Sequence, residues 1–116
     1  MIKFVKNKIM ANTYTWKINQ LDAKIQEGEL SNVIYVIHYN YIAVDPTGKY
    51  TASSVSTLAV EYNPESTFIP YEDLTKEDVV GWLEAGIDVS ILQDALDNQI
   101  NLQINPVNEY LHPDWN

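Results

Sequence analysis

The segment Phe68–Gly86 constrains the fold more than any other part of the chain, because it contains a complete set of helix signals. Thr75 is a natural N-cap, since its hydroxyl can accept a hydrogen bond from the free amides of a first helical turn. Asp78, three residues later, can reach back as a short version of the capping box. Gly86 is expected to end the helix in a left-handed conformation. The apolar stripe expected to face the core is formed by Val79, Trp82 and Leu83.

A second amphipathic helix is predicted directly after the first. Asp88 can cap its first turn, and apolar residues then recur at three- and four-residue spacing. Asn105-Pro106 is expected to end this helix, because proline cannot continue it. The predicted core face is formed by Val89, Leu92, Leu96, Ile100 and Ile104.

Three segments before the helices have the pattern of β-strands. Tyr14–Gln20 alternates apolar and polar residues, Val33–Val44 is rich in β-branched and aromatic residues, and Tyr50–Tyr62 alternates again. Asp45–Gly48 has the composition of a tight turn, so the second and third strands are expected to form an antiparallel hairpin. Residues 22–32 include a glycine and four charged residues, and we expect them to form a connection, either irregular throughout or with a short extended piece at Ala23–Ile25.

This order of elements, three strands and then two helices, favours an α+β domain. We expect a three-stranded antiparallel meander followed by two helices packed on one face, and a C-terminal tail. Residues 1–12 are interpreted as a flexible leader or an alternative start, and residues 13–116 as a single domain. The tail is expected to pack onto the body because it carries three apolar residues, Tyr110, Leu111 and Trp115.

The net charge of the chain limits the classes of molecule that it is expected to bind. The 116 residues carry 7 basic and 16 acidic side chains, a net charge of −9. Lys3, Lys6 and Lys8 lie in the first ten residues, so the rest of the chain has 4 lysines against 16 acids, or −12. Such a domain repels nucleic acid and anionic membranes, and neither is expected as a partner. The acidity serves solubility or, alternatively, attracts a basic partner by mimicking nucleic acid.

No combination of residues predicts catalysis, a metal site or a cofactor. The chain has no cysteine and two histidines, and it has no serine in a nucleophile-elbow motif. His38, in the middle of a predicted strand, is interpreted as a hydrogen-bonded structural residue. Asp94 and Asp97 lie one helical turn apart, a spacing typical of a solvated helix face. We therefore expect a protein that is not an enzyme and binds no cofactor.

Aromatic residues are the remaining candidates for function. Tyr35, Tyr39 and Tyr41 alternate along the central strand and so share one face of it. One interpretation is that they pack beneath the helices with their hydroxyls at the rim. The other is an exposed aromatic surface that binds another protein, since tyrosine is enriched at interface hot spots.

Four segments together carry a resemblance to a known group of proteins: Val33–Asp45, Gly48–Ala52, Phe68–Trp82 and Ala95–Ile100. In these segments, and in a tryptophan close to the C-terminus, the chain resembles a family of small proteins of unassigned function encoded by tailed bacteriophages, many of them marine. The resemblance covers nearly the whole chain from Tyr14 to Trp115. It implies location in the virion or in the host cytoplasm, and it carries over no catalytic residues.

These observations favour a non-enzymatic phage protein that acts through protein–protein contacts, such as a minor head or tail accessory component of the virion. The alternative is an early acidic modulator, or nucleic-acid mimic, that binds a basic host protein. In both cases the expected partner is a protein of the phage or of its host, and a homo-oligomer is left open.

Overall fold

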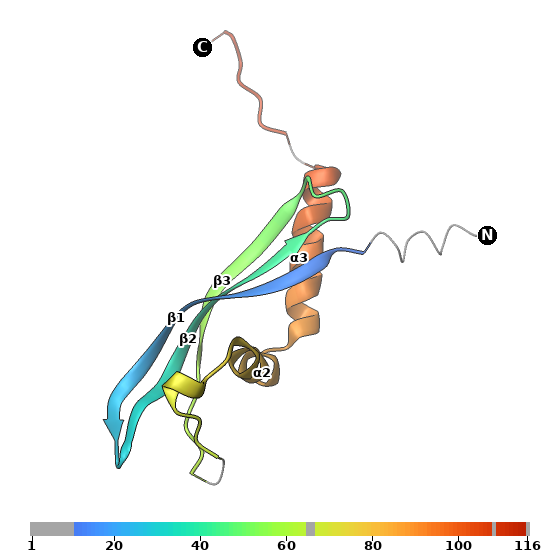
Figure 1. The fold of residues 1–116 in the computed structure, drawn as a ribbon. Helices are drawn as coiled ribbons and strands as arrows, with labels where there is room; N and C mark the ends of the chain where they lie inside the picture. Colours follow the sequence, from blue (N-terminus) through green and yellow to red (C-terminus); the bar gives the residue numbers. More distant parts are fainter. Residues whose placement is uncertain (1–10, 65–66, 108, 116) are drawn as a thin grey trace, which may run out of the picture.

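The computed structural model describes residues 11–64, 67–107 and 109–115. Within these ranges the chain forms three strands, one short 3₁₀-helix and two α-helices (Figure 1). The strands form one antiparallel sheet in the order β1-β2-β3, which confirms the predicted α+β meander followed by two helices. The elements are β1 (Thr13–Glu27), β2 (Leu30–Val44), β3 (Thr51–Ala59), η1 (Tyr71–Asp73), α2 (Lys76–Gly86) and α3 (Val89–Ile104).

The first hairpin is longer than the sequence predicted. β1 and β2 pair from Thr13↔Val44 to Glu27↔Leu30, so the expectation of a connection over residues 22–32 was wrong, although the extended piece allowed at Ala23–Ile25 lies in β1. Gly28, with φ of 62°, lies in the tight turn between the two strands. The far end of this hairpin projects beyond the helices (Figure 1). Its β1 residues alternate apolar and polar side chains from Leu21 to Gln26, but they are half-buried or exposed, and the charged residues and glycine among them outweighed this short pattern.

The second hairpin contains the predicted turn. Gly48, with φ of 79°, donates its amide to the carbonyl of Asp45 at 3.0 Å. The Asp45 carboxylate is buried and accepts hydrogen bonds from the Tyr50 amide at 3.0 Å and the Thr47 hydroxyl at 2.7 Å. Burial alone would raise the pKa of Asp45, but these hydrogen bonds outweigh it and lower the pKa. β3 then ends at Ala59, three residues earlier than predicted.

Helix α2 begins as predicted. The Thr75 hydroxyl accepts from the Asp78 amide at 3.2 Å, and the Asp78 carboxylate accepts from the Thr75 amide at 3.0 Å, which completes the capping box. The left-handed stop expected at Gly86 was wrong, because Gly86 is the last helical residue and an extended Ile87 follows it. A Cβ atom at Gly86 would lie 2.9 Å from Leu58 Cδ2. Glycine at this position therefore allows α2 to approach β3 closely.

Helix α3 also matches its predicted signals. The Asp88 side chain accepts from the Ile91 amide at 3.3 Å, and the helix ends at Ile104, just before Asn105-Pro106. Of the predicted stripe, Leu96 and Ile100 are buried, Val89 and Leu92 are partly buried, and Ile104 is exposed.

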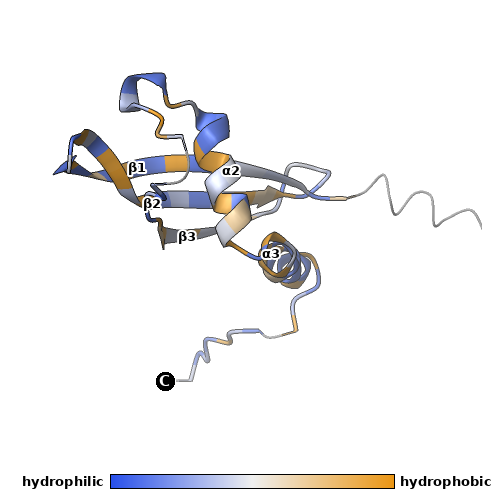
Figure 2. Cartoon of the chain, turned by 90° about the horizontal axis from the view of Figure 1, so that it is seen from below, coloured by the Kyte–Doolittle hydropathy of each residue, from blue (hydrophilic) through white to orange (hydrophobic). Residues whose placement is uncertain are grey.

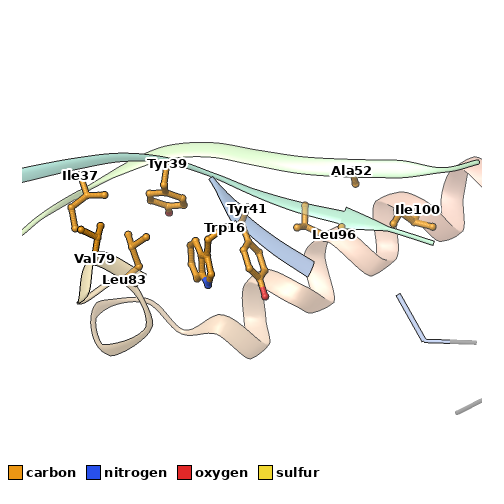
Figure 3. Packing of buried hydrophobic residues seen from close by; sticks show 10 residues of the cluster. Trp16, Ile37, Tyr39, Tyr41, Ala52, Val79, Leu83, Leu96 and Ile100 are labelled. Atoms are coloured by element: carbon orange, nitrogen blue, oxygen red, sulfur yellow. The ribbon is translucent and has the colours of Figure 1, made fainter. Parts of the chain in front are cut away.

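The core lies between one face of the sheet and the two helices. Figure 3 shows aromatic and aliphatic side chains of the sheet directed toward α2 and α3, and Figure 2 shows α3 next to β3. The opposite sheet face carries half-buried residues of β2, and no helix of the described residues lies over it. The buried residues that meet in the core are Trp16, Ile37, Tyr39, Tyr41, Ala43, Ala52, Val79, Leu83, Leu96 and Ile100.

The two ends of the chain differ in their contacts with the sheet and helices. Asn12 lies just before β1 and donates a hydrogen bond from Nδ2 to Asp97 Oδ1 at 2.8 Å; most of the predicted leader, residues 1–10, lies outside the described residues. The expectation that the C-terminal tail packs onto the body was wrong, because Tyr110, Leu111 and Trp115 are all exposed. The tail leaves the end of α3 and runs away from the sheet (Figure 1). Three apolar residues in a short segment after a proline did not suffice to fold it back.

Candidate functional site

The three tyrosines predicted to form an interaction surface lie in different environments. Tyr39 and Tyr41 are 6% and 3% exposed and belong to the core, whereas Tyr35 is 41% exposed. All three occupy the helix-facing side of β2, but Tyr35 lies toward the projecting end of the hairpin, where Lys24 Nζ is 5.9 Å from its ring centroid. The two buried rings cannot reach a partner in this arrangement, so of the three only Tyr35 presents its ring to solvent.

The buried tyrosines belong to an aromatic cluster between the sheet and the helices. The Trp16 ring lies 4.2 Å from the Tyr41 ring and 5.5 Å from the Tyr39 ring, measured between centroids. Tyr14 stacks on Tyr41 at 5.8 Å with an interplanar angle of 8°. Offset-stacked and edge-on pairs of this kind add stability beyond the apolar area they bury. The cluster thus joins β1 to β2 beneath the helices (Figure 3).

Side chains of α3 form hydrogen bonds with the tyrosine hydroxyls at the rim of this cluster. Tyr14 Oη donates to Asp97 Oδ1 at 2.6 Å, and Gln93 Nε2 donates to Tyr41 Oη at 2.8 Å. Burial, the hydrogen bond to Asp97 and the negative charge of Asp97 together raise the pKa of Tyr14 from 10.0 to about 12. At neutral pH Tyr14 is therefore a firmly protonated donor, which suits a structural clasp between β1 and α3 better than proton transfer.

His38 has the hydrogen-bonded role expected for it. Its Nε2 lies 2.9 Å from Asp22 Oδ2, so the ring bridges β2 to β1 on the face without helices. The hydrogen bond with His38, supported by one from Gln20, lowers the pKa of Asp22. Across the described ranges, no three histidine or acidic side chains converge as metal ligands would.

An apolar groove lies where β3 ends against α2. It has a volume of about 420 Å³, and its walls come from β2, β3, α2 and the segment between β3 and η1. Glu61 is the one charged side chain among the described lining residues, and the Tyr62 and Phe68 rings meet edge to face at 5.7 Å. Leu58, Phe68 and Trp82 supply much of the apolar wall. Trp82 belongs to the apolar stripe that was predicted to face the core, so packing rather than a surface was expected of it.

The tail carries four strongly exposed apolar side chains. Val107, Tyr110, Leu111 and Trp115 are 76%, 86%, 76% and 84% exposed. The sequence did not predict that these residues are exposed. An apolar residue in a tail gives the same sequence pattern whether it packs onto the body or projects from it. The two aromatic rings of the tail, Tyr110 and Trp115, are therefore more exposed than Tyr35 on the central strand.

Comparison with protein families shows that residues 11–115 match the model of a domain of unknown function, DUF7936. The chain belongs to the DUF7936 family. No curated protein and no solved structure shows significant similarity to it.

The DUF7936 match extends well beyond the compact body. It begins before β1 and ends at residue 115, so it contains the sheet, both helices and the exposed tail. The tail is therefore part of the domain itself and not an addition to it. No helix in the described part of this DUF7936 protein is long and apolar enough to cross a bilayer.

Proposed function

We propose that this DUF7936 protein works without catalysis, by binding another protein through its C-terminal tail. The observation that carries the proposal is the exposure of four large apolar side chains, Val107, Tyr110, Leu111 and Trp115, in a segment that lies inside the family domain. Tyrosine and tryptophan are the residues most enriched at the energetic centres of protein interfaces.

The form of the tail suits recognition by a partner. Pro106 and Pro113 lie at its two ends, and each disfavours helical backbone at the residue before it. A segment without helix or strand that carries apolar residues at intervals can enter a groove on another protein or add to the edge of its sheet. Binding would remove from water the rings that the free protein leaves exposed.

The biological setting in this proposal is a tailed bacteriophage, where the protein would serve as a minor head or tail accessory component. This part is supported by the sequence resemblance described above. Mass spectrometry of purified virions tests it: recovery of the protein at a constant number of copies per particle is expected. Repeated absence from intact virions would contradict an accessory role in the particle.

Affinity capture tests the contact function directly. The full-length protein is used as bait in lysate of cells that express it naturally, beside a triple variant, Y110A/L111A/W115A. We expect a specific protein to be retained by the wild type and lost with the triple variant, because the exposed rings would be the anchor. Asp114→Asn, which changes the tail without removing a ring, is the matched control and should retain the partner. Equal capture by the triple variant and the wild type would contradict the proposal.

The alternative function, an acidic modulator of a basic host protein, has one structural observation in its favour. Exposed acids cluster around η1 and the start of α2, at Glu72, Asp73 and Glu77. The same capture experiment separates the two functions. A basic, nucleic-acid-binding protein that is retained by the triple variant and released by moderate salt would favour the modulator.

A further inference from the structure

The two edges of the sheet differ in how well they resist pairing with another strand. On β1 the register is interrupted after Ile18 and again after Asp22, and charged side chains are frequent. Irregularities and charges are the features by which proteins protect an exposed sheet edge. β3 has neither: its nine residues, TASSVSTLA, include no charged residue and no proline, and its register with β2 is unbroken from Thr51 to Ala59.

Two hydrogen bonds show which backbone groups of β3 face outward. At one end of the strand the Asp45 amide donates to the Tyr50 carbonyl, and at the other the Val60 amide donates to the Tyr35 carbonyl, both at 3.0 Å. Residues bonded to the neighbouring strand alternate with residues that face away from it. The even-numbered residues of β3 therefore bond to β2. The odd-numbered residues direct their N–H and C=O groups to the open edge, among them Ser53, Val55 and Thr57.

Helix α3 closes one end of this edge and leaves the middle open. Gln103 Nε2 donates to the outward carbonyl of Thr51 at 2.7 Å. Beyond this point Ser53, Val55 and Thr57 are exposed, and Val55, the large apolar residue of the group, is 69% exposed. The open window is therefore Ser53–Thr57.

This window is nearly symmetric about its centre. Val55 has a serine on each side, and the next residues outward, Ser53 and Thr57, both carry a hydroxyl. If two copies meet antiparallel with Val55 opposite Val55, Ser53 of each lies opposite Thr57 of the other. Pairs of β-branched residues and pairs of hydroxyl residues are favourable across antiparallel strands, and no charge opposes another charge.

We propose that the protein forms a two-fold symmetric dimer in which β3 pairs antiparallel with β3 of a second copy, centred on Val55. The pairing joins two three-stranded sheets into one continuous sheet and completes about six backbone hydrogen bonds. The α3 helices of the two copies cover opposite ends of the paired window, since Thr51 lies about 13 Å along the strand from Val55. This inference concerns a different surface from the tail and goes beyond the proposed function.

Pairing of β3 with β3 of a second copy suits this edge better than head-to-tail pairing of β3 with β1 of another copy. Pairing of β3 with β1 of another copy would bring a uniform strand against a bulged and charged one, and it would leave a free β3 edge at the end of every assembly. Pairing of β3 with β3 uses the open edge of both copies and closes the assembly as a dimer.

Sedimentation of the full-length protein tests the dimer. Each copy carries a net charge of −9, so the measurement is made at about 0.15 M salt, where the Debye length is about 8 Å and repulsion is screened. We expect the mass to approach twice the 13.3 kDa of one chain as the protein concentration rises toward about 1 mM. Val55→Lys should remain a monomer throughout, because it places two ammonium groups against each other at the two-fold axis. Thr15→Lys, the same change of charge on the exposed face of the other edge strand, is the matched control and should still dimerise.

Disulfide crosslinking tests the same dimer if Val55→Lys fails to fold. The chain has no cysteine, and opposed residues of a hydrogen-bonded antiparallel pair lie at about the Cα separation that a disulfide needs. Under mild oxidation V55C should form a covalent dimer and T15C should remain a monomer. The proposal is overturned if the wild type stays monomeric over the whole concentration range, if V55K dimerises as well as the wild type, if T15K abolishes dimerisation as V55K does, or if T15C crosslinks as readily as V55C.

Discussion

Tyr14 shows how one side chain joins the first strand to the last helix. Its ring stacks on Tyr41, and its hydroxyl donates to Asp97 at 2.6 Å. Tyr14 belongs to both the core and the surface, because its ring packs inward while its hydroxyl donates to a carboxylate at the rim of the core. Alternation in the sequence placed Tyr14 on the apolar face of its strand; the carboxylate that it reaches lies 83 positions away and could not be inferred from local pattern.

The pKa of Tyr14 predicts how stability depends on alkaline pH. Its folded-state pKa of about 12 lies above the ordinary 10.0, so the folded protein holds the phenolic proton more tightly than the unfolded chain does. The stabilisation is complete below pH 10 and is lost as pH rises from 10 toward 12. Tyr14→Phe lacks this dependence and should cost about 1 kcal/mol at neutral pH, through the missing hydrogen bond.

Urea unfolding of both proteins between pH 7 and pH 11.5 measures this difference. The advantage of the wild type over Tyr14→Phe should shrink steadily above pH 10. A difference that stays constant across this range would contradict the proposed protonation of Tyr14.

At the scale of the elements, the boundaries of helices and strands were predicted correctly where they depend on residues close together in the sequence. The Thr75–Asp78 box and the Asp88 cap were identified correctly because a cap depends on residues within one helical turn. The projecting part of the β1–β2 hairpin was missed because its strands are held by each other's backbone rather than by an apolar face. Gly86 was misinterpreted for a related reason: its Cα lies against the Leu58 side chain of β3, a contact that no local pattern contains.

The two glycines of α2 provide a matched test of that reason. A Cβ at Gly81 would have no atom within 4 Å, whereas a Cβ at Gly86 would lie 2.9 Å from Leu58 Cδ2. Gly81→Ala should therefore stabilise the protein by about 0.5–1 kcal/mol, because alanine has the higher helix propensity. Gly86→Ala should fall below Gly81→Ala by about 1 kcal/mol, because Leu58 must shift. Thermal unfolding of the two variants compares them, and equal stabilisation would show that α2 does not press against β3.

At the scale of the whole molecule, the chain divides into a packed body and surfaces left for contact. The core was predictable in outline, since the stripes of both helices and the alternation of β2 mark most of the buried residues. The candidate site was not predictable. Burial of Tyr39 and Tyr41 depends on how far the helices reach across the sheet, and exposure of Trp115 depends on the direction in which the tail leaves α3. Composition reveals neither. Two surfaces remain: the aromatic tail, proposed to bind another protein, and the β3 edge, proposed to bind a second copy.

The central claim is that the tail residues serve contact and contribute nothing to the fold of the body. The most direct test is the free energy of unfolding of the full-length Y110A/L111A/W115A variant in urea, at a protein concentration low enough to keep it monomeric. Because the three side chains are exposed, we expect a value within about 0.5 kcal/mol of the wild type. A loss of about 3 kcal/mol or more, the cost of truncating buried aromatic and leucine side chains, would show that the tail belongs to the core.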